Sequence, residues 1–156
     1  MEQHDFTNIR LPTYAKSSYS PSLPRDFRGL KIIMPLKINI SEKERIPFFG
    51  AFQVSSRVDE KSGGKLTENT VLVFVNKETS ETFSFNLVPD KEPIKQDQSS
   101  LPQSTGTLVE EYTIRMYFNI DVLHFFPEFP KETAGYIVYA TALDIKSNVI
   151  ETKIIY

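Results

Sequence analysis

The clearest structural signal in the chain is the segment YTIRMYFNI, residues 112–120. In it the apolar residues Ile114, Met116 and Phe118 alternate with Thr113 and Arg115 and with the residues that follow. Successive side chains of a β-strand point to opposite faces of a sheet, so a period of two is typical of a strand with one face in a core. The segment therefore predicts a half-buried β-strand.

The same alternation recurs on both sides of this segment. Leu36, Ile38 and Ile40 alternate with polar residues, and Gly50 is expected to mark a bulge or a close backbone approach. Further strands are predicted at 46–55, 69–76, 82–88, 134–143 and 148–155. With about seven strands and no convincing amphipathic helix, the predicted fold class is all-β, an antiparallel sandwich or a Greek-key barrel.

Two polar connections interrupt the strands. Residues 58–69, which contain a Ser-Gly-Gly-Lys turn, are predicted to form a loop. Residues 89–106 form a longer connection, interpreted as a mobile surface loop or as a crossing between two sheets.

The chain divides into an extended arm, residues 1–28, and a sandwich domain, residues 29–156. Pro12, Pro21 and Pro24 interrupt the arm, and no strand or helix period survives in it. The arm is nevertheless too apolar for a plain solvated tail. We expect it to pack either on its own domain or on a partner.

A short segment near the C-terminus resembles a known family. Glu132, Ala134, Tyr136 and Val138 stand at alternate positions, as an acidic residue, a small residue, a tyrosine and a core residue do in immunoglobulin-like domains. The segment is similar to the entry of the penultimate strand in bacterial immunoglobulin-like modules. The resemblance implies an immunoglobulin-like or related Greek-key sandwich and a tendency toward binding roles. It also implies a tyrosine corner, in which the Tyr136 hydroxyl bonds to the backbone, although Val138 replaces the cysteine of antibody domains.

Composition bounds the function. The 156 residues suit one domain, and 18 basic against 20 acidic residues leave a net charge of −2 with no basic cluster, so no nucleic-acid partner is expected. The chain has no cysteine. Because it shows no signal peptide and no apolar run of about 20 residues, we expect no membrane insertion and a cytoplasmic location, with leaderless export left open.

No residue pattern predicts catalysis. His4 and His124 are the only histidines, and the adjacent carboxylates Glu110 and Glu111 point to opposite faces of a strand. Asp59-Glu60 is the other pair of adjacent carboxylates. We therefore predict no enzyme activity, no cofactor and no metal site.

Aromatic residues outside the strands are the candidates for partner contact. Residues 122–130 lie between two strands yet hold three phenylalanines, so the segment is interpreted as a short helical turn that plugs one end of the sandwich or as an exposed docking patch. Together with the aromatic residues of the arm, the partner-binding hypothesis names Tyr14, Tyr19, Phe27, Phe125, Phe126 and Phe129.

The sequence thus predicts a non-catalytic protein-interaction or structural module, a subunit of a larger assembly that binds a protein partner or associates with itself. The alternative is a carbohydrate-binding module, because many sandwiches present aromatic rings to sugars. Its candidate residues are Tyr112, Tyr117, Tyr136 and Tyr139. A third hypothesis is a carboxylate-based hydrolase, which requires a buried pair of converging acids in a cleft.

Overall fold

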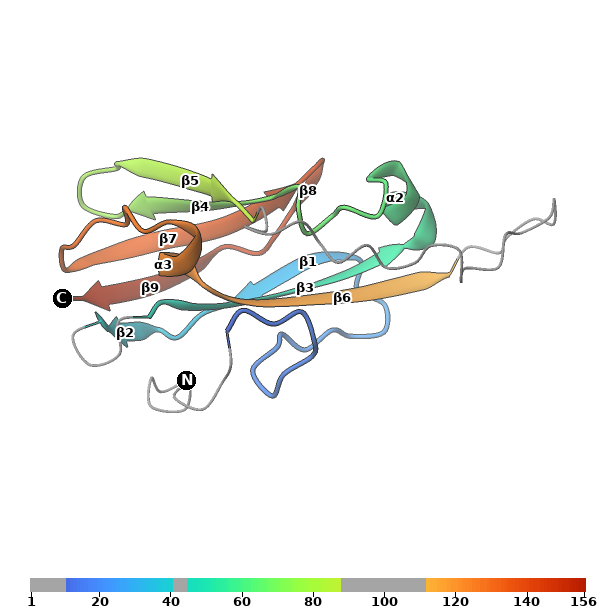
Figure 1. The fold of residues 1–156 in the computed structure, drawn as a ribbon, viewed down its shortest axis with the longest axis horizontal. Coiled ribbons are helices and arrows are strands. Elements are labelled where there is room, and N and C mark those ends of the chain that lie inside the picture. Colours follow the sequence, from blue (N-terminus) through green and yellow to red (C-terminus); the bar gives the residue numbers. More distant parts are fainter. Residues whose placement is uncertain (1–10, 41–44, 88–111) are drawn as a thin grey trace.

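The computed structural model describes residues 11–40, 45–87 and 112–156. Strands dominate it, and they form two sheets packed as a sandwich, which confirms the predicted all-β fold class (Figure 1). The elements are β1 (Gly29–Ile33), β2 (Lys37–Asn39), β3 (Pro47–Ser55), α2 (Ser56–Lys61), β4 (Thr70–Asn76), β5 (Thr82–Asn86), β6 (Thr113–Asp121), α3 (Val122–Phe125), β7 (Ala134–Ala142), β8 (Ile145–Lys146) and β9 (Ile150–Ile155).

The two sheets differ in size. The smaller sheet has the order β1-β3-β6 and is antiparallel throughout. The larger sheet has the order β2-β9-β7-β4-β5, with β8 paired to β7, and only its β2–β9 pair is parallel. The pairs β3–β6, β4–β7 and β2–β9 join distant parts of the chain, whereas β4–β5 and β7–β8 are consecutive hairpins, so the topology combines crossing connections with local hairpins.

The chain changes sheets between β1 and β2. The strand predicted at 36–40 is found as β2 in the larger sheet, and β1, just before it, lies in the smaller sheet. Side chains of the C-terminal region hold the crossing in place. The Thr152 hydroxyl donates to the Pro35 carbonyl at 2.7 Å, and the Asn148 side-chain amide exchanges two hydrogen bonds with the backbone of Ile32, at 2.8 and 3.1 Å. The free edge of β1 is thus paired by an amide side chain.

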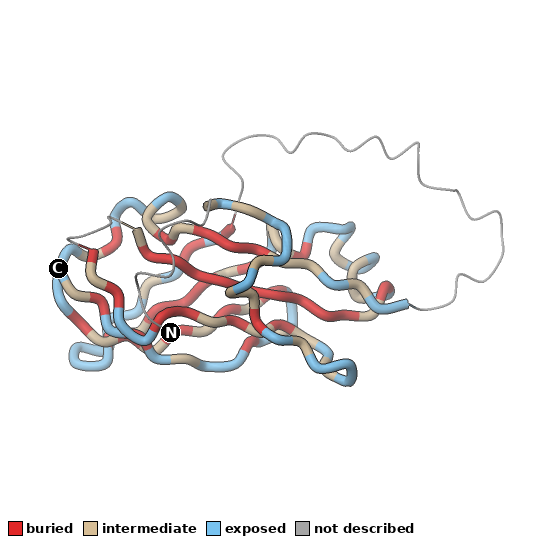
Figure 2. The backbone as a smooth tube through the Cα atoms, turned by 90° about the horizontal axis from the view of Figure 1, so that it is seen from below, coloured by how far each residue is buried: buried red, intermediate tan, exposed pale blue. Residues whose placement is uncertain are grey.

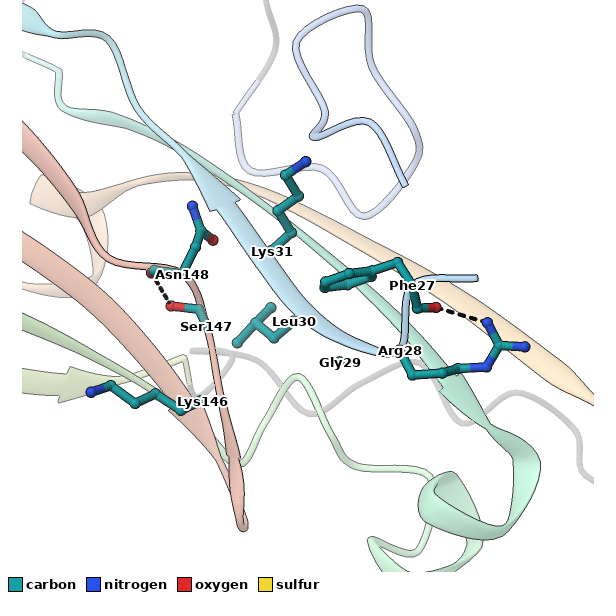
Figure 3. Close-up of a pocket in the computed structure, with 8 residues that line it drawn as sticks. All are labelled: Phe27, Arg28, Gly29, Leu30, Lys31, Lys146, Ser147 and Asn148. Carbon is teal, nitrogen blue, oxygen red and sulfur yellow. Dashed lines mark hydrogen bonds between the residues drawn. The ribbon is translucent and has the colours of Figure 1, made fainter. Parts of the chain in front are cut away.

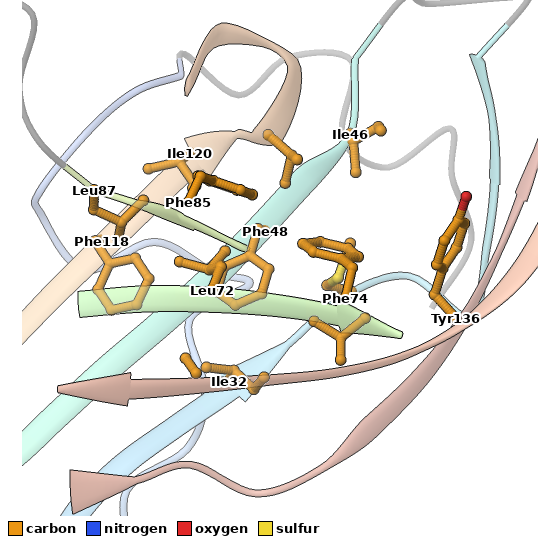
Figure 4. Packing of buried hydrophobic residues seen from close by; sticks show 14 of the residues in the cluster. Ile32, Ile46, Phe48, Leu72, Phe74, Phe85, Leu87, Phe118, Ile120 and Tyr136 are labelled. Atoms are coloured by element: carbon orange, nitrogen blue, oxygen red, sulfur yellow. The ribbon is translucent and has the colours of Figure 1, made fainter. Parts of the chain in front are cut away.

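Between the sheets lies a core rich in phenylalanine (Figure 4). Phe48 and Phe52 of β3 and Phe118 of β6 face Leu72 and Phe74 of β4, all fully buried. Along the sandwich, buried and less buried residues alternate on most strands (Figure 2). This is the pattern that the period of two predicts.

Gly50 marks a close approach, as expected from its place in an apolar strand. A β-carbon on Gly50 would overlap the ring of Phe118, which lies directly over the glycine. The absence of a side chain at this position is what allows the ring to reach the backbone of β3.

The segment 122–130 plugs the sandwich. α3 follows β6 directly, and its N-cap is the Asp121 side chain, which accepts a hydrogen bond from the Leu123 amide at 3.0 Å. Beyond α3, Phe126 stacks on Phe85 of β5 at a centroid distance of 5.6 Å. Phe129 meets the ring of Phe74 edge-on at 5.3 Å. Of the two interpretations of this segment, the helical turn that closes one end of the core is therefore the one found.

Two details differ from the sequence-based expectation. Residues 56–61, at the start of a predicted loop, form the short helix α2, whose first turn is capped by the Ser55 hydroxyl accepting from the Arg57 amide at 3.1 Å. The predicted tyrosine corner is wrong. The Tyr136 side chain is fully buried, and its hydroxyl has no hydrogen-bond partner among the described residues. The predicted connection at 89–106 lies outside the described residues.

Candidate interaction surface

The N-terminal arm forms a third layer on the smaller sheet. Residues 11–28 run along the side of β3 and β6 that faces away from the larger sheet (Figure 1). Thr13 and Asn119 exchange backbone hydrogen bonds at 2.9 and 2.8 Å, so the arm extends the free edge of β6. Further along, Tyr19 packs on Phe49 with 5.8 Å between ring centroids. The arm therefore packs on its own domain, the first of the two expected arrangements.

Two buried amide side chains anchor this layer. Gln53 of β3 donates through Nε2 to the carbonyls of Pro24 at 2.8 Å and Phe27 at 2.7 Å, and its Oε1 accepts from Arg115 at 2.6 Å. Asn119 of β6 donates to the Thr13 hydroxyl at 2.9 Å and to the carbonyl of Ala15 at 2.7 Å. The arm has few backbone partners of its own, so these side chains satisfy its carbonyl groups. We call this side of the sandwich the covered face.

The outer side of the larger sheet carries no such layer among the described residues. Because Leu72, Phe74, Tyr136 and Val138 point into the core, the residues between them on β4 and β7 point outward. These outward residues are mainly apolar, and cross-strand register places Val73 opposite Tyr139 and Val75 opposite Ile137. We call this side the open face, and its central apolar stripe comprises Val71, Val73, Val75, Ile137 and Tyr139.

Polar side chains border the stripe. On β5 the outward residues are Thr82, Ser84 and Asn86, all exposed, and on β9 they include Glu151 and Lys153. An apolar centre with a polar rim is the anatomy of a protein-binding patch. The same positions on an ordinary solvated sheet face would be polar throughout.

Two lysine side chains lie across the open face. Lys77 passes over Gly135, where an added β-carbon would meet its alkyl chain at 3.4 Å, and its ammonium pairs with Glu151 of β9 at 3.1 Å. The Lys146 ammonium lies 4.8 Å from the centroid of the Tyr139 ring. Both chains cover apolar surface with their methylenes while they keep their charge in solvent.

One pocket opens elsewhere, between β1 and the turn that joins β8 to β9 (Figure 3). It measures about 320 Å³ and is lined by residues 27–31 and 146–148. The charged ends of Arg28, Lys31 and Lys146 point away from one another in Figure 3. Arg28 donates to the carbonyls of Arg25 and Phe27, and Lys31 donates to that of Ser22. The charges do not converge, so the pocket does not form an anion site.

The residues of the partner-binding hypothesis differ in burial and in location. Tyr14 is 51% exposed on the arm. Tyr19 and Phe27 are half-buried, the first against Phe49 and the second beside Gly29. Of the three phenylalanines at 125–129, two are half-buried and Phe129 is fully buried in the core. The structure does not bring these six residues together on one surface.

The tyrosines of the carbohydrate hypothesis are also dispersed. Tyr136 is buried in the core, Tyr139 lies on the open face and Tyr117 on the covered face. Tyr112 is exposed just before β6. They share no common platform.

Titratable groups are scattered over the described residues. Burial, and then the neighbouring Glu60 carboxylate, raises the pKa of the Asp59 carboxyl, but Asp59 lies on α2 and does not line the pocket described above. His124 is exposed, with the Phe125 ring edge-on at 5.3 Å. His4, Glu110 and Glu111 lie outside the described residues.

Neither a metal cluster nor a membrane span is found in residues 11–40, 45–87 and 112–156. No group of three or more histidine, cysteine, aspartate or glutamate side chains gathers there to hold an ion. No helix in these ranges has the length and apolarity to cross a bilayer.

Comparison with known proteins adds no relative: no family model matches the chain, and no curated protein and no solved structure is significantly similar to it. The arguments for function therefore rest on the geometry of the chain itself.

The sequence held a signal for the open face that the strand pattern alone did not single out. Residues 71–75, Val-Leu-Val-Phe-Val, are apolar without alternation, which is typical of a strand covered on both faces. Within residues 11–40, 45–87 and 112–156, the structure provides a covering layer on one face of this strand only. A strand that is apolar on both faces but covered on one indicates that its other face is an interaction surface.

Proposed function

We propose that the chain is a non-catalytic protein-binding module that docks its partner on the open face of the larger sheet. The observation that carries this proposal is the contrast between a β4 sequence apolar on both sides and a structure in which, among the described residues, no further layer of chain lies over the outer side. A partner layer would complete the second side, as the arm completes the outer side of the smaller sheet.

The size of the open face supports the proposal. Five strands at about 4.8 Å spacing and a β7 of nine residues at about 3.3 Å each describe an area of roughly 700 Å². A standard protein interface buries about 800 Å² on each partner. The face is therefore large enough for stable docking.

The proposal is tested by affinity purification from the native source with the full chain as bait. We expect partner proteins that the wild type retains and that the double variant Val75→Gln, Ile137→Gln loses, because the two substitutions remove neighbouring side chains from the centre of the stripe. Tyr14→Gln is the matched control, since it removes an exposed aromatic residue of the arm. If Tyr14→Gln loses the partners and the stripe variant keeps them, the arm is the binding element and the open face is not.

We also propose that the domain is related to immunoglobulin-like modules. The division into a β1-β3-β6 sheet and a larger sheet with a parallel β2–β9 pair supports this relation. Val138 at the cysteine position and the unpaired Tyr136 hydroxyl are departures from the family pattern. The relation concerns ancestry of fold and adds nothing to the binding argument.

A further inference from the structure

On the basis of the proposed function, we infer that the partner presents to the open face an extended acidic segment, in which carboxylates about six residues apart flank apolar side chains. The inference rests on three features of this face: the sign of its charges, their spacing along β7, and the way in which they oppose self-association.

The charges of the open face are mostly positive. Lys37 of β2 and Lys153 of β9 point outward, because Ile38 and Ile154 beside them point into the core. Lys77 and Lys146 lie over the face, and Glu151, which pairs with Lys77 at 3.1 Å, is the one acidic residue within the described strands of this sheet. The chain as a whole has a net charge of −2, so this face is distinct from the rest of the molecule in sign.

Lys37 and Lys153 are direct neighbours in the β2–β9 register. Both side chains are exposed, and no ion pair joins either of them to a carboxylate in the described part of the chain. Like charges on adjacent strands repel each other, so the free chain carries a small electrostatic cost at this point. A carboxylate from a partner would remove that cost and would gain two cations at once.

The lysines stand at both ends of the apolar stripe. Lys153 is in register with Gly135 of β7, and Lys146 with Thr141, so the two positions are separated by about six residues, or roughly 20 Å of extended chain. Between them on β7 lie Ile137 and Tyr139. An extended partner segment that follows β7 would place apolar side chains on the stripe and carboxylates near each group of lysines.

The same distribution opposes a second copy of this chain as the occupant. A two-fold axis parallel to β7 places Lys153 of one copy near Lys77 of the other, since β9 and β4 flank β7. An axis perpendicular to β7 places Lys153 opposite Lys146. Both arrangements bring lysines together, and juxtaposed like charges suppress association.

The experiment is a selection of displayed random dodecapeptides on the immobilised full chain, followed by fluorescence anisotropy with the enriched peptides. We expect enrichment of peptides with aspartate or glutamate on both sides of apolar residues. The double variant Lys37→Glu, Lys153→Glu should bind them at least about tenfold more weakly, because it removes two cations and adds two repelling anions. Lys61→Glu, Lys65→Glu on and after α2 is the matched control with the same change in net charge, and we expect its affinity to stay within about twofold of wild type.

The outcomes separate the inference from the proposed function. Enriched peptides without acidic residues, whose binding is lost in Val75→Gln, Ile137→Gln, would overturn the acidic partner and leave the docking face in place. Peptides that bind the stripe variant as well as the wild type, or no enrichment, would overturn both. Displacement of the acidic peptides by a fifteen-residue oligothymidine at equal concentration would identify the lysines as a nucleic-acid site and would also overturn the inference. We expect no displacement.

Discussion

The two outer faces of the sandwich provide an internal comparison. On the covered face, Phe49, Ala51 and Gln53 of the central strand β3 are 0% exposed because the arm lies over them. On the open face, Val73 at the centre of the stripe is 9% exposed, and Val75 and Ile137, at outward positions beside it, remain half-buried. Both faces are apolar at their centres. The comparison teaches that an apolar outer face is covered by an additional layer. On the covered face this layer is the chain's own N-terminal arm, and on the open face, by our proposal, it is a partner.

The two faces should differ most in the loss of unfolding free energy that follows when one apolar side chain on each face is truncated. Phe49→Ala should lower the free energy of unfolding by about 3–5 kcal/mol, because it empties a site sealed between β3 and the arm. Val75→Ala should cost about 1 kcal/mol or less, because its methyl groups already contact solvent. Urea unfolding of both variants measures the difference. Equal losses would show that the arm does not seal Phe49.

The second prediction concerns the anchor of the arm. Gln53→Ala should lower the free energy of unfolding by about 2 kcal/mol, since it removes the donor to three arm carbonyls and the acceptor for Arg115. It should also release the arm, so that trypsin cleaves after Arg25 faster than in the wild type. Asn148→Ala is the matched control, because its amide pairs with Ile32 at the opposite edge and does not touch the arm. If both variants are cleaved at the same rate, Gln53 is not the anchor.

Substitution of Tyr136, on the inner side of the larger sheet, should change the free energy of unfolding by less than the two preceding changes and in the opposite direction. Tyr136→Phe should stabilise the chain by about 1 kcal/mol at pH 7, because it removes a buried hydroxyl that finds no hydrogen-bond partner in the described part of the chain. A loss of stability of that size would instead indicate the hydrogen bond of a tyrosine corner. Urea unfolding decides between the two signs.

The same variant carries a pH prediction. Burial, followed by the nearby carboxylate of Glu132, raises the pKa of Tyr136 to about 12. The folded chain therefore holds this proton at a pH where the unfolded chain has released it, and stability declines as pH rises from about 10 through 12. In Tyr136→Phe that part of the decline should be missing. The free energy of unfolding should therefore fall less between pH 8 and pH 11 in the variant than in the wild type, which urea unfolding at the two pH values measures.

The smallest effect is expected on the rim of the open face. Lys153→Glu replaces a like-charged neighbour of Lys37 with an opposite charge and should stabilise the free chain by about 0.2–1 kcal/mol at low salt. The gain should vanish in 1 M NaCl because exposed charges are then screened. Lys65→Glu, which follows α2, should show no such salt-dependent gain. A loss of stability on Lys153→Glu would mean that the two lysines do not repel each other in the free chain.

Much of the fold was accessible from the sequence because the alternation of side chains is a local property. The strands at 112–120, 69–76 and 82–88 were predicted from neighbouring residues, and the plug at 122–130 was one of the two interpretations of that segment. The separation of β1 from β2 was not, because it depends on Asn148 and Thr152, more than 100 residues away along the chain. The helix α2 was missed because six residues carry too little periodicity to detect.

The aromatic residues that the sequence singled out as partner contacts do not form one surface in the structure. Aromatic residues outside strands were chosen as partner contacts, yet Phe126 and Phe129 close the core and Tyr19 packs on Phe49. An aromatic side chain in the sequence indicates that it avoids water. It does not indicate whether the chain's own core or a partner buries it. The better signal was the uninterrupted apolar run of β4, which records two faces that require cover.

By itself, the sequence determined which residues form strands and which side of each strand avoids water, since both follow from the period of the chain and the hydrophobicity of its residues. Only the tertiary structure decided which apolar sides are already covered. Coverage depends on where the arm lies and on which strands become neighbours, and those contacts join residues far apart in the sequence. For this reason the open face emerges only when both sheets and the arm are seen together.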